Sequence, residues 1–153
     1  MAYHFEFDKI ENTKITPRRT NNWGKSYKGK YSWVQWIVTD EDRGDGAGMG
    51  AQPHAHPEEQ IIIALEGTMR ILMGGVEYTI KPGDVFVIPP DELHEEFCDT
   101  KFVWYSIKNR IPGHSWYTTE WEPGAEEAWE EIKAKYDEME QNFHEQMPPY
   151  MKS

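Results

Sequence analysis

The sequence is short of the features that mark secreted and membrane proteins. It has a single cysteine, Cys98, among 153 residues, so no intrachain disulfide can form, which fits a reducing compartment. No apolar run approaches about 20 residues, the length that a membrane-spanning helix needs. The first nine residues, MAYHFEFDK, are charged and lack the apolar centre of a secretory signal. We therefore expect a cytoplasmic protein that has no membrane partner.

Basic residues are also scarce. The chain has 16 Lys and Arg against 27 Asp and Glu, and its net charge is −11. A nucleic-acid-binding surface needs a basic footprint, so we expect no nucleic-acid partner. The stretch between Glu11 and Asp40 differs, because it lacks acids and contains Lys14, Arg18, Arg19, Lys25, Lys28 and Lys30. It is either a solvated arm that balances an acidic body or a positive field beside a site for a small anion.

Short apolar segments separated by glycine and proline turns predict an all-β fold. Tyr31–Thr39 is rich in aromatic and β-branched residues and predicts a strand. The glycine-rich segment Asp40–Gln52 predicts a loop. Six further strands are expected at Gln60–Leu65, Thr68–Met73, Val76–Ile80, Asp84–Ile88, Leu93–Cys98 and Phe102–Lys108. No helical pattern separates them, which favours a sandwich or closed barrel over a parallel βαβ sheet.

The C-terminal part has a different periodicity. Acidic residues crowd its start, where they favour the N-terminus of a helix, and Pro148 and Pro149 follow it. Spacings of three and four predict an amphipathic α-helix at about residues 125–146, whose apolar stripe is Trp129, Ile132, Tyr136, Met139 and Phe143. With an N-terminal arm at 1–29 and a core barrel at about 30–112, we expect one domain spanning residues 1–153.

Three histidines and a glutamine have the spacing of a metal site. His54 and His56 are two residues apart, so their side chains share a face if the segment is a strand. His94 follows a later strand and a Pro-Pro turn, and the intervening hairpins could bring it opposite the other two. Gln60 opens an apolar strand and can offer an amide oxygen. Neighbouring imidazoles of this kind predict a bound metal ion.

The same residues resemble the two sequence motifs of the cupin superfamily. The stretches are Gly48-x5-His54-x-His56-x3-Gln60-x6-Gly67 and Gly83-x5-Pro89-x4-His94. The resemblance implies a small single-domain cupin: an antiparallel double-stranded β-helix, or jelly-roll barrel, that forms a homodimer. It also implies one divalent metal ion per chain (Zn, Ni, Fe, Mn or Co), held by His54, His56, Gln60 and His94.

The string HPEEQ at residues 56–60 is similar to the first motif of small cupins that linearise unsaturated uronates in pectin and alginate breakdown. This resemblance implies a metal-dependent proton transfer on a sugar acid. The uronate-linearising cupins tend to have an acid on the last strand, whereas Phe102–Lys108 has none.

Gln60 stands where the first cupin motif usually has a glutamate. Glu59 would replace it as a ligand if the strand entered one residue out of register, but the six residues before Gly67 favour Gln60. Neutral ligands leave the full charge on the ion, which favours Lewis-acid and proton-transfer chemistry of the isomerase or lyase type on a small anionic substrate, a carboxylate or sugar acid. Open coordination positions also suit a non-haem dioxygenase, and a non-catalytic ligand-binding cupin is the third hypothesis.

Residues next to His94 are candidates for the chemistry. Glu96 is two residues further on and shares its face. It is either a general acid and base or a carboxylate that holds a histidine in place. We expect Glu95 to point outward and Cys98 to be a small buried side chain.

Other candidates would bind the substrate. On the last strand, Trp104 and Ser106 share one face and Tyr105 lies on the other, and the sequence does not decide which face is inside. Arg70 and Lys108 either anchor a substrate carboxylate or belong to a solvated exterior.

Overall fold

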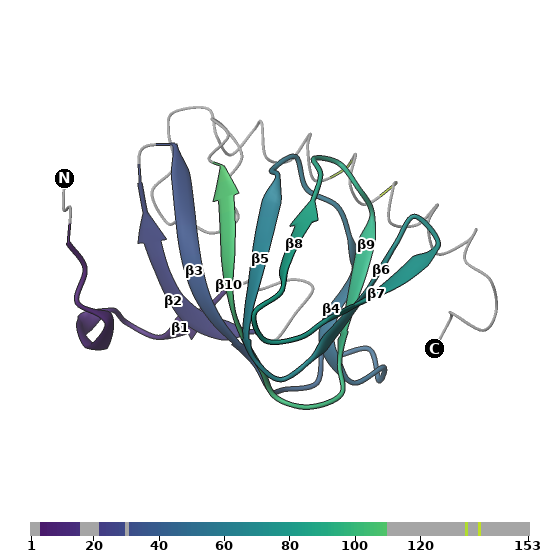
Figure 1. The fold of residues 1–153 in the computed structure, drawn as a ribbon, viewed down its shortest axis with the longest axis horizontal. Helices are drawn as coiled ribbons and strands as arrows, with labels where there is room; N and C mark the ends of the chain where they lie inside the picture. Colours follow the sequence, from purple (N-terminus) through teal and green to yellow (C-terminus); the bar gives the residue numbers. More distant parts are fainter. Residues whose placement is uncertain (1–3, 16–21, 30, 110–133, 135–137, 139–153) are drawn as a thin grey trace.

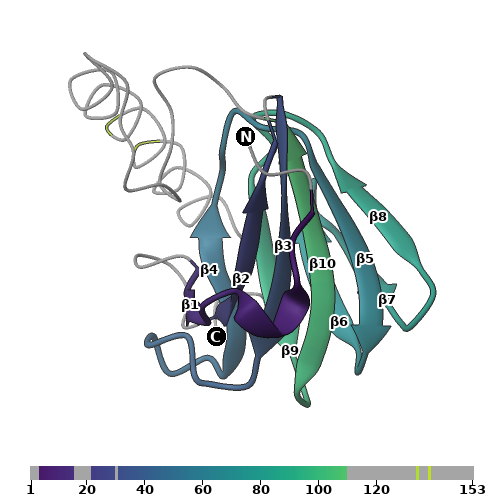
Figure 2. The same cartoon turned by 90° about the vertical axis from the view of Figure 1, so that its left-hand side faces the viewer.

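Two antiparallel β-sheets face each other across the interior of the protein (Figures 1 and 2). The computed structural model describes residues 4–15, 22–29 and 31–109, together with Ala134 and Glu138. In these residues a short 3-10 helix, η1 (Phe7–Lys9), precedes ten strands. No helix in this part of the chain combines the length and the apolar character that crossing a membrane would require.

The larger sheet, sheet A, has six strands in the order β1-β2-β3-β10-β5-β8. Side chains of β3 and β5 alternate between buried and half-buried, as expected when one face of a sheet covers a core. The strands are β1 (Thr13–Lys14), β2 (Trp23–Lys28), β3 (Ser32–Thr39), β5 (Gln60–Glu66), β8 (Val85–Ile88) and β10 (Phe102–Asn109).

The smaller sheet, sheet B, has four strands in the order β4-β9-β6-β7. Gly74 and Gly75 join β6 to β7 with φ angles of 60° and 76°. This left-handed backbone is what a two-residue hairpin turn requires and what glycine adopts without strain. The strands are β4 (Met49–His54), β6 (Met69–Met73), β7 (Val76–Ile80) and β9 (His94–Cys98).

The core between the sheets has an apolar part and a polar part. The indole of Trp104 belongs to the apolar part and donates a hydrogen bond to Thr39 Oγ1 at 3.1 Å. The remaining apolar members include Ile37, Ile62, Ala64, Met69, Ile71, Ile80, Ile88, Cys98 and Phe102. The polar part consists of buried side chains that include His56, Gln60, His94, Glu96, Ser106 and Lys108. Every predicted metal ligand except the half-buried His54 is therefore a core residue.

The outer face of sheet A is strongly apolar. Val87, Ile61, Ile107 and Val34 are consecutive partners across β8, β5, β10 and β3. Val87 is 47% exposed at the β8 edge. A single chain is described, so the expected homodimer stays a prediction, and this face is the surface on which we expect it to form.

The N-terminal arm contributes to the same outer face. The Phe7 ring packs edge-on against Trp36, with ring centroids 5.0 Å apart. Lys25 Nζ donates to the Phe7 carbonyl oxygen at 2.7 Å and lies 4.3 Å from the centre of that ring. Lys25 thus stabilises the arm. Arg18, Arg19 and Lys30 lie outside the described residues.

The two-sheet, antiparallel architecture confirms the all-β prediction. The prediction of a loop at Asp40–Gln52 is wrong for its last part, because β4 begins at Met49 and pairs with β9. Of the helix predicted at about 125–146, only Ala134 and Glu138 are described and the rest lies outside the described residues. The helix and the single domain spanning residues 1–153 therefore stay predictions.

Candidate metal centre

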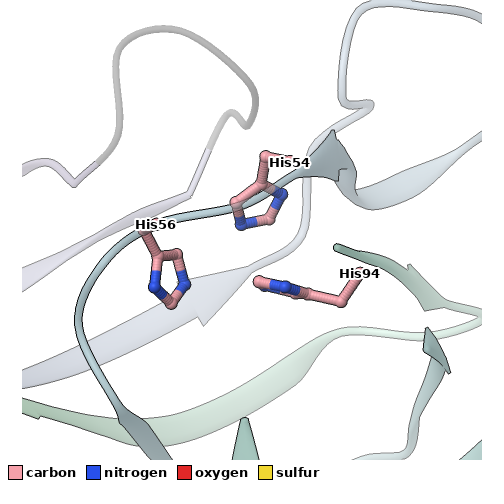
Figure 3. A group of neighbouring side chains, drawn as sticks. All are labelled: His54, His56 and His94. Atoms are coloured by element: carbon pink, nitrogen blue, oxygen red, sulfur yellow. The ribbon is translucent and has the colours of Figure 1, made fainter. Parts of the chain in front are cut away.

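Three histidines meet at one end of the space between the sheets (Figure 3). His54 ends β4 and His94 begins β9, and the two are paired after an irregularity in the β4–β9 register. His56 lies just beyond β4. The ring centroids of His54 and His94 are 4.2 Å apart, and the His56 centroid is 5.1 Å from that of His94. One ring nitrogen of each histidine lies within 4.8 Å of the other two.

Backbone carbonyls orient all three rings in the same way. The Nδ1 atoms of His54, His56 and His94 lie 2.6, 3.0 and 2.9 Å from carbonyl oxygens of Gln52, Glu58 and Glu92 respectively. A carbonyl only accepts, so the Nδ1 atoms of His54 and His94 carry the proton of the neutral ring and their Nε2 atoms keep the lone pair. This is the arrangement by which metal-binding histidines are usually held.

Gln60 lies beside this group. Its Oε1 is 3.1 Å from His56 Nε2, and its Nε2 donates to Ser106 Oγ at 2.9 Å. His56 has an oxygen acceptor at each ring nitrogen, so when its single proton is donated to the Glu58 carbonyl, its Nε2 and Gln60 Oε1 are two facing acceptors. A cation bound between two facing acceptors stabilises them, so His56 Nε2 and Gln60 Oε1 are suited to bind a metal ion together.

Burial and nearby charge keep His56 and His94 neutral. Burial is the main cause that lowers the pKa of His94 to about 4, and the charge of Lys108 lowers it further. Burial also puts the pKa of His56 well below its ordinary value, aided by Lys108 and by the two other rings. Only a neutral imidazole binds a metal, so His56 and His94 are in the ligating form at neutral pH.

The residues present fit a divalent metal ion. The Nε2 of His94 is buried and has no hydrogen-bond partner among the described residues. A buried polar atom without a partner costs free energy unless something binds it. Three imidazole nitrogens and one amide oxygen form a ligand set that suits Zn, Ni, Co, Fe or Mn. The His54, His56 and His94 cluster could therefore hold one metal ion.

Glu96 lies next to the cluster on the inner face of β9. Its side chain is buried, and its Oε1 is 4.0 Å from His94 Nε2. Burial raises the pKa of Glu96 to about 7, against the opposing effects of Lys108 and Arg43. The predicted catalytic residue is thus adjacent to the histidines and is close to half-protonated at neutral pH.

Lys108 is a buried residue of the site, with 6% exposure. It pairs with Gln60 across the β10–β5 ladder, on the inner face of sheet A. The alternative of a solvated exterior is therefore wrong for Lys108. Burial lowers its pKa to about 8, and Glu58 and Glu96 oppose that shift. Sequence reasoning also missed Glu58, which is fully buried between two ligand positions with its Oε2 3.7 Å from His56 Nδ1.

The remaining candidates separate by face. Trp104 and Ser106 are buried on the inner face of β10, with Ser106 bonded to Gln60. Tyr105 is half-buried on the opposite face, paired with Trp36 and Ile63. The structure therefore places Trp104 inside the barrel and Tyr105 outside it.

Arg70 lies away from the histidines. It is on the outer face of sheet B and pairs with Asp99 at 3.1 Å and Glu77 at 3.2 Å. Two acidic partners on the surface account for its charge, so the structure does not bring it to the site as a substrate anchor. Cys98 is buried as expected, and burial raises the pKa of its thiol.

Glu95 points to the outer face of sheet B, as alternation along β9 requires. It is not in solvent, however, because it is 1% exposed and forms an ion pair with the buried Arg43. The predicted outward direction of Glu95 agrees with the structure, and its burial comes from Arg43 in the loop before β4.

Comparisons with known proteins agree with this geometry. Residues 45–108 match the family model described as Cupin domain. A search of curated proteins finds no match. An RmlC-like cupin from Shewanella frigidimarina NCIMB 400 is 20% identical, with a TM-score of 0.58 over 72% of this chain and 93% of that one.

Two further solved structures are similar over most of their length. KdgF from Halomonas sp. is 19% identical, with a TM-score of 0.56 over 70% of this chain and 94% of that one. The polyketide cyclase RemF from Streptomyces resistomycificus is 14% identical, with a TM-score of 0.61 over 86% of this chain and 99% of that one. At these identities the similarity shows the fold alone: the chain has a cupin fold.

Proposed function

We propose that the protein is a divalent-metal-dependent enzyme that acts on a small organic anion by Lewis-acid and proton-transfer chemistry. One observation supports it most. Three inward histidines, each held by a backbone carbonyl at Nδ1, lie beside Glu96, a buried carboxyl group whose pKa in the metal-free protein is about 7. Ligands for a metal and a group that can exchange a proton near neutral pH are thus neighbours.

His54, His56, Gln60 and His94 would hold the ion. When bound there, a divalent ion supplies Lewis acidity, which polarises a carbonyl or carboxylate oxygen. The four neutral ligands would leave its charge undiminished. The carbonyl contacts at the three Nδ1 atoms would keep the rings from turning as a substrate enters.

Glu96 would move the proton. Its Oε1 is 4.0 Å from His94 Nε2, so a substrate atom bound next to the histidines would be within reach of the carboxylate. As a base, Glu96 would accept a proton from the carbon beside the polarised carbonyl, exchange it with solvent, and as an acid deliver a proton to another substrate atom. The net reaction is an isomerisation or an elimination, and no oxidant is consumed.

Lys108 supports an anionic substrate. A divalent ion and Lys108 would carry three positive charges, against the two negative charges of Glu58 and Glu96 when both are ionised. One positive charge would remain in a buried region, and a monoanion such as a carboxylate would balance it. Lys108 would then be the residue of the site that favours a carboxylate over a neutral substrate.

Structural similarity alone does not select the substrate. One structural neighbour is named a polyketide cyclase, but at 14% identity it shows only the fold. The motif at residues 56–60 favours a uronate, whereas β10 lacks an acidic residue. We therefore propose the broader class of small carboxylates and sugar acids.

The test begins with metal content. Untagged protein is reconstituted separately with Zn, Ni, Co, Fe and Mn and compared with His94→Ala by elemental analysis. Solvent deuterium incorporation into a panel of 2-oxo acids and uronates is then followed by NMR, with oxygen uptake measured in parallel. We expect one metal ion per chain, lost in His94→Ala, and deuterium incorporation that Glu96→Gln abolishes while it keeps the metal.

Other results would favour the other functions. Oxygen uptake with iron bound and no deuterium incorporation would indicate a dioxygenase. Binding without turnover would indicate a non-catalytic cupin. For the charge argument, Lys108→Met should weaken carboxylate binding at least tenfold relative to the exposed control Lys101→Met. Equal affinities in these two variants would contradict it.

A further inference from the structure

Arg43 is a buried arginine on the outer face of sheet B, behind the histidines. It is 4% exposed and lies in the loop before β4. Its Nη1 donates to the carbonyl oxygens of Ala51 at 3.1 Å and Glu96 at 3.2 Å. Its Nη2 pairs with Glu95, and its Nε donates to Asp45 Oδ1 at 2.8 Å. Every nitrogen of the guanidinium therefore has a protein partner.

These contacts lie at a particular point in the sheet. Ala51 and Glu96 face each other in the β4–β9 ladder, and Nη1 bridges their two carbonyls. The register shifts directly after Ala51 and is resumed only at the His54–His94 pair. Arg43 thus holds the last regular pair before the irregularity that sets His54 opposite His94. Irregularities of this kind re-aim side chains next to functional sites.

A second link runs from Arg43 to the ring of His54. The Gln52 side chain donates from Nε2 to the Arg43 carbonyl oxygen at 3.1 Å. The backbone carbonyl of the same Gln52 accepts the hydrogen bond of His54 Nδ1 at 2.6 Å. The loop that carries Arg43 therefore fixes the residue that orients the His54 ring.

We propose that Arg43 is a positioning residue of the histidine centre. By joining its loop to the paired carbonyls of Ala51 and Glu96, it sets where β4 departs from its register and thereby fixes His54 relative to His94. The proposal deepens the metal-dependent function above and rests on it for its consequence, which is tight metal binding. Arg43 itself touches neither the ion nor a substrate.

Arg70 offers a matched control. The guanidinium carbon atoms of Arg43 and Arg70 lie 4.7 and 5.2 Å from the centre of the Phe97 ring, and both arginines are ion-paired. Arg70 joins β6 to Glu77 on β7 and to Asp99, which follows β9, and none of its hydrogen bonds in the described residues reaches β4. Loss of Arg70 therefore removes an ion-paired arginine from the same Phe97 ring without touching the β4–β9 irregularity.

The variant must avoid leaving Glu95 buried and unpaired. Replacing a buried ion pair by apolar residues is often neutral for stability, whereas removing one partner is strongly destabilising. The test variant is accordingly the double substitution Arg43→Met with Glu95→Leu. Arg43→Lys, which keeps the charge and loses the forked geometry, is the second variant.

The experiment measures Co²⁺ affinity by chelator competition, together with the visible spectrum of the bound ion. We expect binding to weaken about 10- to 100-fold in the double variant, the usual effect of losing a residue that holds a metal ligand. Its spectrum should change, while Arg70→Met stays within twofold of the parent. Wild-type affinity and spectrum in a folded double variant would overturn the proposal. An equal loss of affinity in the double variant and in Arg70→Met would overturn it as well.

A metal-free measurement separates this proposal from the proposed function. Imidazole ¹H–¹⁵N NMR of the metal-free protein reports which nitrogen of His54 carries the proton. We expect the Nδ1–H form in the parent and in Arg70→Met, and a mixture of forms in the double variant. If the parent binds no metal, the proposed function fails, and an unchanged His54 in the double variant would then overturn the role of Arg43 as well.

Discussion

Replacing His94 by leucine should stabilise the metal-free protein and remove its response to metal. His94 is fully buried and its Nε2 has no partner among the described residues. A buried polar atom of this kind costs about 1–3 kcal/mol. Leucine removes that cost and loses one hydrogen bond to Glu92, worth about 1 kcal/mol. Glu92 is exposed, so water can replace the lost donor.

The expected net gain is about 1 kcal/mol of unfolding free energy, or a rise in Tm of roughly 2–4 °C for a chain of this length. With metal bound, the parent should become the more stable of the two proteins. An ion at 100 times its Kd stabilises the folded parent by about 2.7 kcal/mol, which is roughly 5–11 °C in Tm. His94→Leu should show almost none of this shift.

The assay is thermal unfolding followed by circular dichroism, with chelator and then with each metal ion. His4→Leu is the control, because His4 is exposed and not part of the cluster. It should keep the full metal-dependent shift. A His94→Leu protein that is less stable than the parent in chelator, and that gains as much from metal, would refute the reasoning.

Three further predictions follow from the same geometry. In metal-free protein, the Glu96 pKa of about 7 exceeds its ordinary value, so the stability linked to its protonation is present below pH 4.5 and is lost as the pH rises through 7. Measured by urea unfolding, the unfolding free energy of Glu96→Gln relative to that of the parent should rise by about 3 kcal/mol as the pH is raised from 4.5 to 8. A difference that does not change with pH would contradict this. Gly50→Ala should cost more than about 1 kcal/mol, because Gly50 has φ +131° and its Cβ would lie 2.0 Å from the Glu96 carbonyl oxygen; the control Gly46→Ala, with open space around it, should cost less, and equal losses would argue against the close approach. Light scattering should show a dimer that Val87→Glu, on the apolar face, dissociates and Thr79→Glu, on the other sheet, does not; a monomeric parent would rule the dimer out.

The sequence predicted β3, the strands after β4 and the histidine cluster, because strand and ligand patterns depend largely on local spacing. His54 and His56 are two residues apart, and His94 follows a turn and begins β9. The pairing of β4 with β9 therefore brings the three histidines together. β2 escaped detection as a strand because its six residues include two lysines and a glycine. Its pairing with β3 decides its structure, and this pairing is not a local property.

The roles of Lys108 and Arg43 could not be predicted in the same way. Alternation assigns residues to two faces of a strand without telling which face is inside, and Lys108 is placed only by its pairing with Gln60. Arg43 pairs with Glu95, which is 52 positions away in the sequence, as well as with Asp45, which is two positions away. The sequence offers several acidic residues near Arg43 and gives no sign that the distant Glu95 is a partner. The sequence also could not decide the role of Arg70. A basic residue on a predicted strand has the same sequence pattern whether it faces the interior, as a substrate anchor would, or faces solvent, as Arg70 does.

Gln60 and Lys108 are best understood together. They are direct partners across β5 and β10, both are buried, and the charges of Glu58 and Glu96 act on Lys108. A glutamate at position 60 would place three carboxylates around one lysine, and a divalent ion would then leave the site neutral. The neutral Gln60 leaves one positive charge instead, and burial makes that charge costly without an anion. With a divalent ion bound and both carboxylates ionised, the departure from the usual cupin motif at residue 60 and the lysine buried beside it would together favour a negatively charged ligand, as the proposed function expects.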